Sequence, residues 1–251
     1  MNMMDTKGKI KLNYPDEFRI ACKINNLKHE ELVQYFIDHV SFYAFIGGEM
    51  DPQYMWATTV NIDCKEVSGE SVSPISNVAM QEISLRYIKA LTSLIGEDNL
   101  GASEGTARST QVMKDWSVEM LPLTDYQDNI YTDSGDVFSL TFDFNLLCRL
   151  NGLSIVKLLQ YFVDHISLAR ERALNLNNEF TTDPSTAVLL ILLGGHGDLK
   201  NRELPHQETY KKYGLKLLRL DKQQRGEDQA EKRIINYSTF YKEWYDELLK
   251  N

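Results

Sequence analysis

The chain contains few cysteines, and none of them has the spacing of a metal site. Cys22, Cys64 and Cys148 are the only three among 251 residues. An odd number of cysteines leaves one thiol unpaired, and no two of them have zinc-ligand spacing. The cysteine content therefore favours a reduced, intracellular compartment.

The chain also lacks a long apolar segment. Its longest apolar run, residues 187–193, is far shorter than the roughly 20 residues that a membrane-spanning helix needs. The first residues contain no apolar core of the kind that a secretory signal has. We expect a soluble, cytoplasmic protein with no membrane partner.

Catalytic motifs are missing as well. The sequence has no nucleophile elbow, no zinc-hydrolase helix, no kinase motifs and no dinucleotide fingerprint. The glycine cluster at 194–198, GGHGD, lacks the lysine and the Ser/Thr of a P-loop, so it predicts only the end of a helix. We predict no cofactor, and the sequence gives little support to an enzymatic activity.

A stretch of twenty residues occurs twice in the chain. Residues 22–41 (CKINNLKHEELVQYFIDHVS) align without a gap with residues 148–167 (CRLNGLSIVKLLQYFVDHIS) at an offset of 126, and ten of the twenty positions are identical. This match predicts an internal duplication. Two such copies in one chain are expected to pack like the subunits of a fused homodimer.

Each copy is expected to form a strand that leads into a helix. Before the first helix, apolar residues alternate with polar ones in the period of a half-buried strand: Phe18, Ile20, Cys22 and Ile24. Residues 142–150 repeat the pattern, and Asn25-Asn26 and Asn151-Gly152 favour tight turns. The predicted fold class is α+β, mainly helical, with duplicated strand-helix(-helix) units packed about a pseudo-twofold axis.

These patterns divide the chain into four segments. Residues 1–103 form the first half, with a repeat core at 18–46 and a second helix at 75–95. Residues 104–136 connect it to the second half at 137–199, which has a repeat core at 142–177 and a second helix at 184–193. Residues 200–251 form a basic segment and a C-terminal amphipathic helix.

Two histidines recur at matched positions. His39 and His165 each follow an aspartate, Asp38 and Asp164. Near a pseudo-twofold axis these side chains are weak candidates for a metal or small-ligand site, because metals accept imidazole and carboxylate ligands. Adjacent residues on a helix point about 100° apart, so one helix does not present both to one ion. We favour the alternative that each histidine packs in the apolar stripe and makes a hydrogen bond across the interface.

The order strand-helix-helix resembles half of a ribbon-helix-helix protein. The residues that carry the resemblance are Arg19 and Lys23, on the outward face of the first predicted strand. The resemblance implies that two paired strands enter the DNA major groove, with outward side chains that read bases. The matching face of the second strand carries Asp143, Asn145, Leu147 and Arg149, which suits DNA poorly.

The end of the chain differs in charge from the rest. Residues 200–233 contain ten Lys/Arg against six Asp/Glu, although the whole chain has a net charge of −9. Candidates for contacts to phosphate are Lys211, Lys212, Lys216 and Arg219. The final helix places Phe240, Trp244 and Leu248 on one face, which predicts that it docks on the body of the protein or on a partner.

Two main functional hypotheses follow, and a metal or small-ligand protein that uses the paired histidines is a minor third. The first is a non-enzymatic intracellular interaction or regulatory protein that binds a protein partner or itself. The second is a nucleic-acid-binding regulator with a ribbon-helix-helix-like pseudo-dimer. The acidic net charge favours the first hypothesis, because a protein with this charge has little general affinity for nucleic acid.

Overall fold

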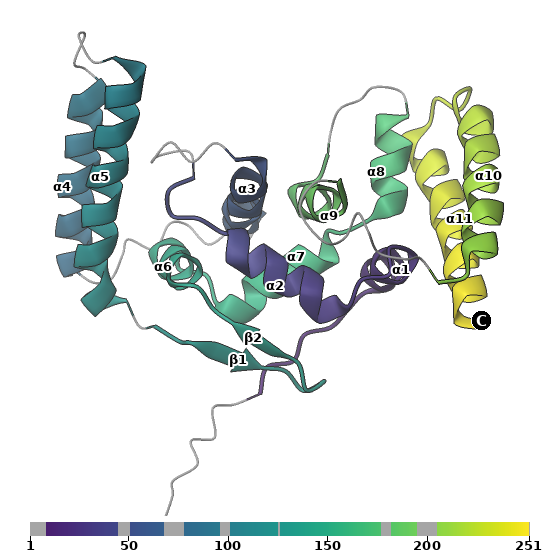
Figure 1. Ribbon diagram of the computed structural model, residues 1–251, viewed down its shortest axis with the longest axis horizontal. Helices are drawn as coiled ribbons and strands as arrows, with labels where there is room; N and C mark the ends of the chain where they lie inside the picture. The colour runs from purple at the N-terminus through teal and green to yellow at the C-terminus, as the bar shows by residue number, and fades with distance from the viewer. Residues whose placement is uncertain are drawn as a thin grey trace, which may run out of the picture. The chain divides into compact units, whose positions relative to one another are not determined.

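The computed structural model (Figure 1) describes most of the chain, namely residues 9–44, 51–67, 78–95, 101–124, 126–176, 182–194 and 205–250. Over these ranges the chain forms eleven α-helices, one short 3₁₀ helix and one two-stranded sheet. The prediction of a mainly helical α+β protein is confirmed.

The chain folds into two compact units. Unit 1 contains Met1–Leu12 and Phe36–Leu159, and unit 2 contains Asn13–Tyr35 and Gln160–Asn251. Two of the three boundaries fall within helix α2 (His29–His39) and helix α7 (Ile155–Asp164), the two helices of the repeated stretch. Each unit therefore contains residues of both copies, and the units do not follow the order of the copies along the chain.

The two segments that we predicted as strands are helices, α1 (Asp16–Ile24) and α6 (Phe142–Asn151). Helix α1 buries Ala21 together with Phe18 and Cys22, and this spacing of three and four residues places them on one helical face. Asp16 and Glu17 in its first turn interact favourably with the helix dipole. The strand prediction was wrong because a short alternating run does not by itself distinguish a strand from a helix.

The turn after each of these helices has the same backbone conformation. Asn26 and Gly152 lie at matched positions, and both have positive φ angles of 51° and 66°. The N–H of Leu27 donates to the carbonyl oxygen of Cys22 at 2.9 Å, and Leu153 donates to Cys148 at the same distance. This bond closes a Schellman helix end, so the predicted tight turn is confirmed in both copies.

The second repeated helix is shorter than the sequence predicts. Helix α7 is capped as expected, because Ser154 Oγ accepts a hydrogen bond from the Lys157 N–H at 3.2 Å. It ends at Asp164, and α8 (Leu168–Asn175) begins with a new cap, in which Ser167 Oγ accepts from the Arg170 N–H at 3.1 Å. The continuous helix expected to 177 is interrupted because Ser167 starts another one.

In unit 1, helices α4 (Val78–Ile95) and α5 (Ala102–Met120) form a hairpin, which Figure 1 shows in blue and teal at the left. Helix α4 ends where we predicted. Residues 102–120, most of which we assigned to a connecting segment, are helical because Met113, Trp116 and Met120 recur at helical spacing and are buried. These side chains form one hydrophobic cluster with Phe42, Met80, Leu91 and Leu146.

The rest of unit 1 includes α3 (Pro52–Val67), the short 3₁₀ helix η1 (Leu121–Leu123) and the sheet. Strands β1 (Asn129–Tyr131) and β2 (Val137–Ser139) are antiparallel, and Ile130 is paired with Phe138. Both of these side chains are buried. The Ile10 N–H donates to the Tyr131 carbonyl oxygen at 2.8 Å, so the first described residues are tied to the end of β1.

Unit 2 has its core among α1, α8, α10 (Gln207–Gln224) and α11 (Ala230–Lys250). The aromatic face of α11 lies in this core. Its hydrophobic cluster comprises Ile20, Ile24, Ala169, Ala173, Tyr213, Tyr237, Phe240, Tyr241, Trp244 and Leu248. The C-terminal helix therefore packs on its own chain, and the partner-docking candidates Phe240, Trp244 and Leu248 are buried there instead of being open to a partner.

Helix α9 (Pro184–Gly194), also in unit 2, begins as the sequence predicts. Proline occupies the first helical position, and Asp183 Oδ1 accepts a hydrogen bond from the Ser185 N–H at 2.9 Å. The helix is largely buried, and Leu190 is its exposed apolar residue. Gly194 ends it, and the remainder of the glycine cluster lies outside the described residues.

Candidate functional site

A buried polar junction in unit 1 joins α6 to the segment after α2. Asp143 Oδ2 accepts a hydrogen bond from the Phe42 N–H at 2.8 Å and a second from the Ser41 hydroxyl. The Ser41 N–H donates to Thr58 Oγ1 of α3 at 3.0 Å, and that hydroxyl donates to the Ser41 carbonyl at 3.2 Å. Burial raises the pKa of Asp143, although its two hydrogen bonds act in the opposite direction. We call this group junction 1.

A second junction with the same components lies in unit 2. Glu17 Oε2 of α1 accepts a hydrogen bond from the Ser167 hydroxyl at 3.1 Å. The Ser167 N–H donates to Thr186 Oγ1 of α9 at 3.1 Å, and that hydroxyl donates to the His165 carbonyl at 3.2 Å. Ser238 of α11 adds a bond to Glu17 Oε1 at 3.0 Å. We call this group junction 2.

The two junctions use residues at matched positions of the repeat. Glu17 corresponds to Asp143 (143 − 17 = 126), and Ser41 corresponds to Ser167 (167 − 41 = 126). Each acid belongs to one copy, and the serine that it contacts belongs to the other copy. Thr58 and Thr186 come from the helix that follows, at an offset of 128. The contacts are therefore reciprocal between the copies.

The junctions were not among our predicted sites. Asp143 was considered only as a residue on a strand surface, and Glu17 was not considered. Two signals were present in the sequence: the serine is one of the ten identical positions, and both copies carry an acid just before Phe18 or Phe144. These signals indicate a contact only if α1 and α6 are helices, and the alternating pattern had led us to predict strands.

The predicted histidine site divides between the two units. Nδ1 of His165 lies 2.8 Å from the Tyr161 carbonyl oxygen, which assigns the proton to Nδ1, and the two rings stack at 3.9 Å. The Asp164 carboxylate accepts from Gln160 Nε2 at 2.7 Å. The ring of His39 lies 5.1 Å from that of Tyr54. Within the described ranges no group of three or more His, Cys, Asp or Glu side chains gathers. The metal site stays a prediction.

The basic candidates lie on two helices. Arg19 and Lys23 are exposed on α1, and Arg19 lies 3.9 Å from Asp16. Because α1 is a helix, the predicted DNA-reading ribbon does not form, and the resemblance to ribbon-helix-helix proteins loses its basis. The predicted cations on α10 are exposed, and three of them contact nearby side chains. Lys211 pairs with Glu208, Lys212 pairs with Glu247, and Lys216 lies over the Tyr213 ring. Arg219 lines a groove between α10 and α11.

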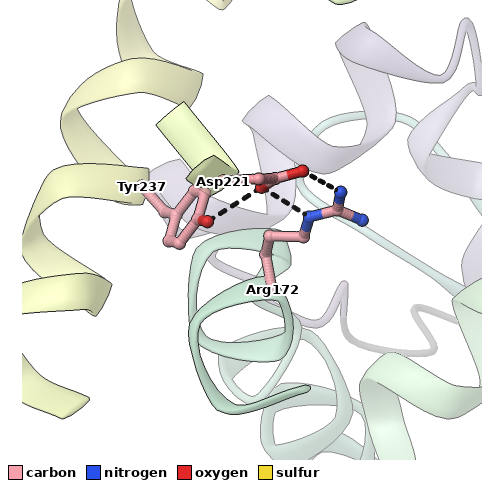
Figure 2. A network of polar contacts seen from close by, with 3 residues as sticks. All are labelled: Arg172, Asp221 and Tyr237. Carbon is pink, nitrogen blue, oxygen red and sulfur yellow. Dashed lines mark hydrogen bonds and ion pairs between the residues drawn. The ribbon is translucent and has the colours of Figure 1, made fainter. Parts of the chain in front are cut away.

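Unit 2 contains a polar network that sequence reasoning missed (Figure 2). The Asp221 carboxylate accepts two hydrogen bonds from the Arg172 guanidinium and one at 2.8 Å from the Tyr237 hydroxyl. Burial raises the pKa of Asp221, but these bonds outweigh burial, and the pKa lies below its usual value. The network joins α8, α10 and α11. Arg172 and Asp221 are 49 residues apart, so no local pattern predicts their contact.

A buried arginine links α11 to α8 and to the turn between α10 and α11. Arg233 of α11 is fully buried, and its guanidinium donates to the Ala173 carbonyl of α8 at 2.9 Å and to the Glu227 carbonyl at 2.8 Å. The sequence contained a signal for it, because Arg233 lies at helical spacing from Tyr237 and Trp244 on the buried face. A charge on that face needs buried hydrogen-bond acceptors.

The cysteines are buried thiols. Burial is the main cause that raises the pKa of Cys22 to about 12, with a contribution from Glu30 and Glu31, and burial raises the pKa of Cys148 to about 12. A thiol is a nucleophile only as the thiolate. Both side chains therefore act as small apolar groups at neutral pH.

No family model, curated protein or solved structure matches the chain. Among the described residues no single helix is long and apolar enough to cross a membrane, and α6 and α7 meet the requirement only as a pair with a bend of 98° between them.

Replacement of either junction threonine by valine should destabilise the protein. Thr58→Val and Thr186→Val keep the side-chain volume but leave the N–H of Ser41 or Ser167 without its acceptor, which costs about 1–3 kcal/mol in each case. Thr59→Val is the matched control, because Thr59 donates only to the Met55 carbonyl of its own helix. We expect it to change the free energy of unfolding by no more than about 0.5 kcal/mol. Urea unfolding measures the free energy of unfolding of all three variants. If Thr58→Val or Thr186→Val leaves it unchanged, the proposed role of the junctions is wrong.

Removal of the Asp221 carboxylate should cost more than removal of an exposed one. Asp221→Ala leaves Arg172 and Tyr237 without their shared acceptor and should lower the free energy of unfolding by about 2–3 kcal/mol. Asp246→Ala, the control, breaks an exposed pair with Lys242 and should cost no more than about 0.5 kcal/mol.

The effect of Asp221 should also depend on pH. Its pKa is lower in the folded chain than in the unfolded chain, so its stabilisation is complete above the unfolded value of about 4 and is lost as the pH falls through the folded value. The difference between wild type and Asp221→Ala should shrink in acid. A difference that grows in acid contradicts this account.

Proposed function

We propose that the chain is a non-enzymatic intracellular interaction or regulatory protein, built by internal duplication as a single-chain pseudo-dimer. Junctions 1 and 2 support this architecture, because each joins the first helix of one copy to the second and third helices of the other. The matched turns at Asn26 and Gly152 support it as well. On this basis the repeat comprises three helices: α1, α2 and α3 in one copy, and α6, α7 and α9 in the other.

The third helix of the first copy is then α3, and not the helix at 75–95 that we predicted from sequence. Thr58 of α3 and Thr186 of α9 carry this correspondence, since both satisfy the backbone N–H of the matched serine. Among the described residues, the helical hairpin α4–α5, helix α8 and the pair α10 and α11 have no counterpart in the other copy. The two halves differ in these helices, so these helices can give each half a different binding partner.

The single observation that carries an interaction function is the outer face of α10. Leu215 and Leu218 are 59% and 57% exposed, although they lie within a helix that buries Tyr213 on its other side. Neighbouring apolar residues exposed on one helix mark a contact surface. Arg219 and Lys222 lie beside them and are exposed too. A protein partner with an apolar and acidic surface fits this face, which we call the α10 face.

Variants of the α10 face test the proposal. Wild type, Leu215→Asp/Leu218→Asp and the control Ile235→Asp are compared by light scattering during size-exclusion chromatography and by affinity capture from the native cells. Ile235 is equally exposed but lies on α11. We expect wild type and control to bind a stoichiometric partner, or to self-associate, and the double variant to lose this binding. A monomer without a partner, or a partner that the double variant retains, contradicts the proposal.

Nucleic-acid binding is the second candidate, and the exposed cations of α10 favour it. Lys216 and Arg219 are exposed beside a groove of about 390 Å³ that α10 and α11 form. Binding through phosphate contacts weakens steeply as salt is added. Fluorescence anisotropy with labelled duplex and single-stranded DNA tests it: Lys216→Glu/Arg219→Glu should abolish a salt-dependent signal, and an unchanged signal contradicts it.

A further inference from the structure

Unit 1 contains a cavity of about 560 Å³ beside the turn that joins α6 to α7. Its buried wall is formed by the apolar side chains of Ile130, Cys148 and Leu153 and by the amide of Asn145. Side chains with polar atoms also line it, among them Gln127, Asn145 and Ser154. The cavity therefore combines an apolar wall with hydrogen-bonding groups, which is the usual character of a small-ligand site.

A single cation stands at this cavity. Arg149 of α6 lines it and is exposed, and its guanidinium has no ion pair among the described residues. The first turn of α7, with Ile155 and Val156, lines the cavity next to it. The Ser154 hydroxyl already accepts from the Lys157 N–H, so the N–H groups of Ile155 and Val156 are those that can face an anion, and the helix dipole favours negative charge there.

The matched turn in the other copy shows what occupies such a position. A smaller cavity of about 460 Å³ lies there, lined by Asn26, Leu27, Lys28 and Glu31. The Glu31 carboxylate is 3.5 Å from the Lys28 N–H, so a carboxylate of the chain itself stands at the start of α2. In the second copy the position of Glu31 is taken by Lys157, and the first turn of α7 contains no acid.

We propose that the unit 1 cavity binds a small organic anion. Its carboxylate or phosphate group lies between Arg149 and the first turn of α7, where it replaces the internal carboxylate of the other copy. Its apolar body lies against Ile130 and Leu153. This site is independent of the α10 face, which lies in the other unit, and it uses neither of the repeated histidines.

The test is a titration of the full-length protein followed by its ¹H–¹⁵N NMR spectrum. The probes are benzoate and phenyl phosphate, with uncharged benzamide of similar shape as the control probe. Benzoate or phenyl phosphate should shift the amide signals of Leu153, Ile155 and Val156 in a saturable way, and the tighter of the two distinguishes a carboxylate from a phosphate ligand. Benzamide should bind at least about tenfold more weakly, because it lacks the charge-assisted bonds.

Three variants decide whether the anion lies where we infer. Arg149→Gln should weaken binding about tenfold, whereas Lys23→Gln, at the matched position of the other copy, should not change it. Lys157→Glu should abolish binding, since it restores the carboxylate that the first copy carries at this place. Unshifted resonances elsewhere in each spectrum report that the variant is folded.

The proposal is overturned if benzamide binds as tightly as benzoate, or if no probe gives a saturable shift at these amides. It is also overturned if Arg149→Gln and Lys23→Gln have the same effect, because the anion is then attracted by surface charge in general.

Discussion

A serine follows the end of the second helix in each copy, and its backbone N–H needs a hydrogen-bond acceptor outside that helix. In both copies a threonine hydroxyl of a later helix accepts this bond, at 3.0 Å for Ser41 and 3.1 Å for Ser167. An acid on the first helix of the opposite copy holds the same serine by its hydroxyl. Three helices from the two copies therefore contact one serine. These contacts explain why both copies have serine at this position.

The sequence predicted the tight turns after α1 and α6, the start of α9 and the end of α4 correctly, whereas the internal duplication stays a prediction. It misassigned α1 and α6, because Phe18, Ile20, Cys22 and Ile24 satisfy both the strand period and, with Ala21, a helix buried on two sides. The error had consequences. A helix with Glu17 or Asp143 in its first turn can bind the serine of the other copy. The predicted strands instead led us to propose a two-stranded ribbon that binds DNA.

Contacts between distant residues were beyond sequence reasoning. Asp221 meets Arg172 and Tyr237 only after α8, α10 and α11 have packed, and the cavity at Arg149 depends on where β1 and Ile10 lie against α6. The interpretation of the C-terminal segment from its composition was also incomplete. We considered the aromatic face of α11 as a surface for a partner, but it packs in the core of unit 2. The exposed Leu215 and Leu218 lie instead on α10, where a basic sequence drew attention to charge.

The central claim is that the two copies complete each other's units. The most direct measurement is to express residues 1–125 and 126–251 as separate chains and to record the circular dichroism and ¹H–¹⁵N spectra of each alone and of the equimolar mixture. Each unit contains helices of both chains, so the account predicts that neither chain alone gives the spectrum of the intact protein and that the mixture restores it. If each chain folds alone and the mixture is only their sum, the copies are independent domains and the account is wrong.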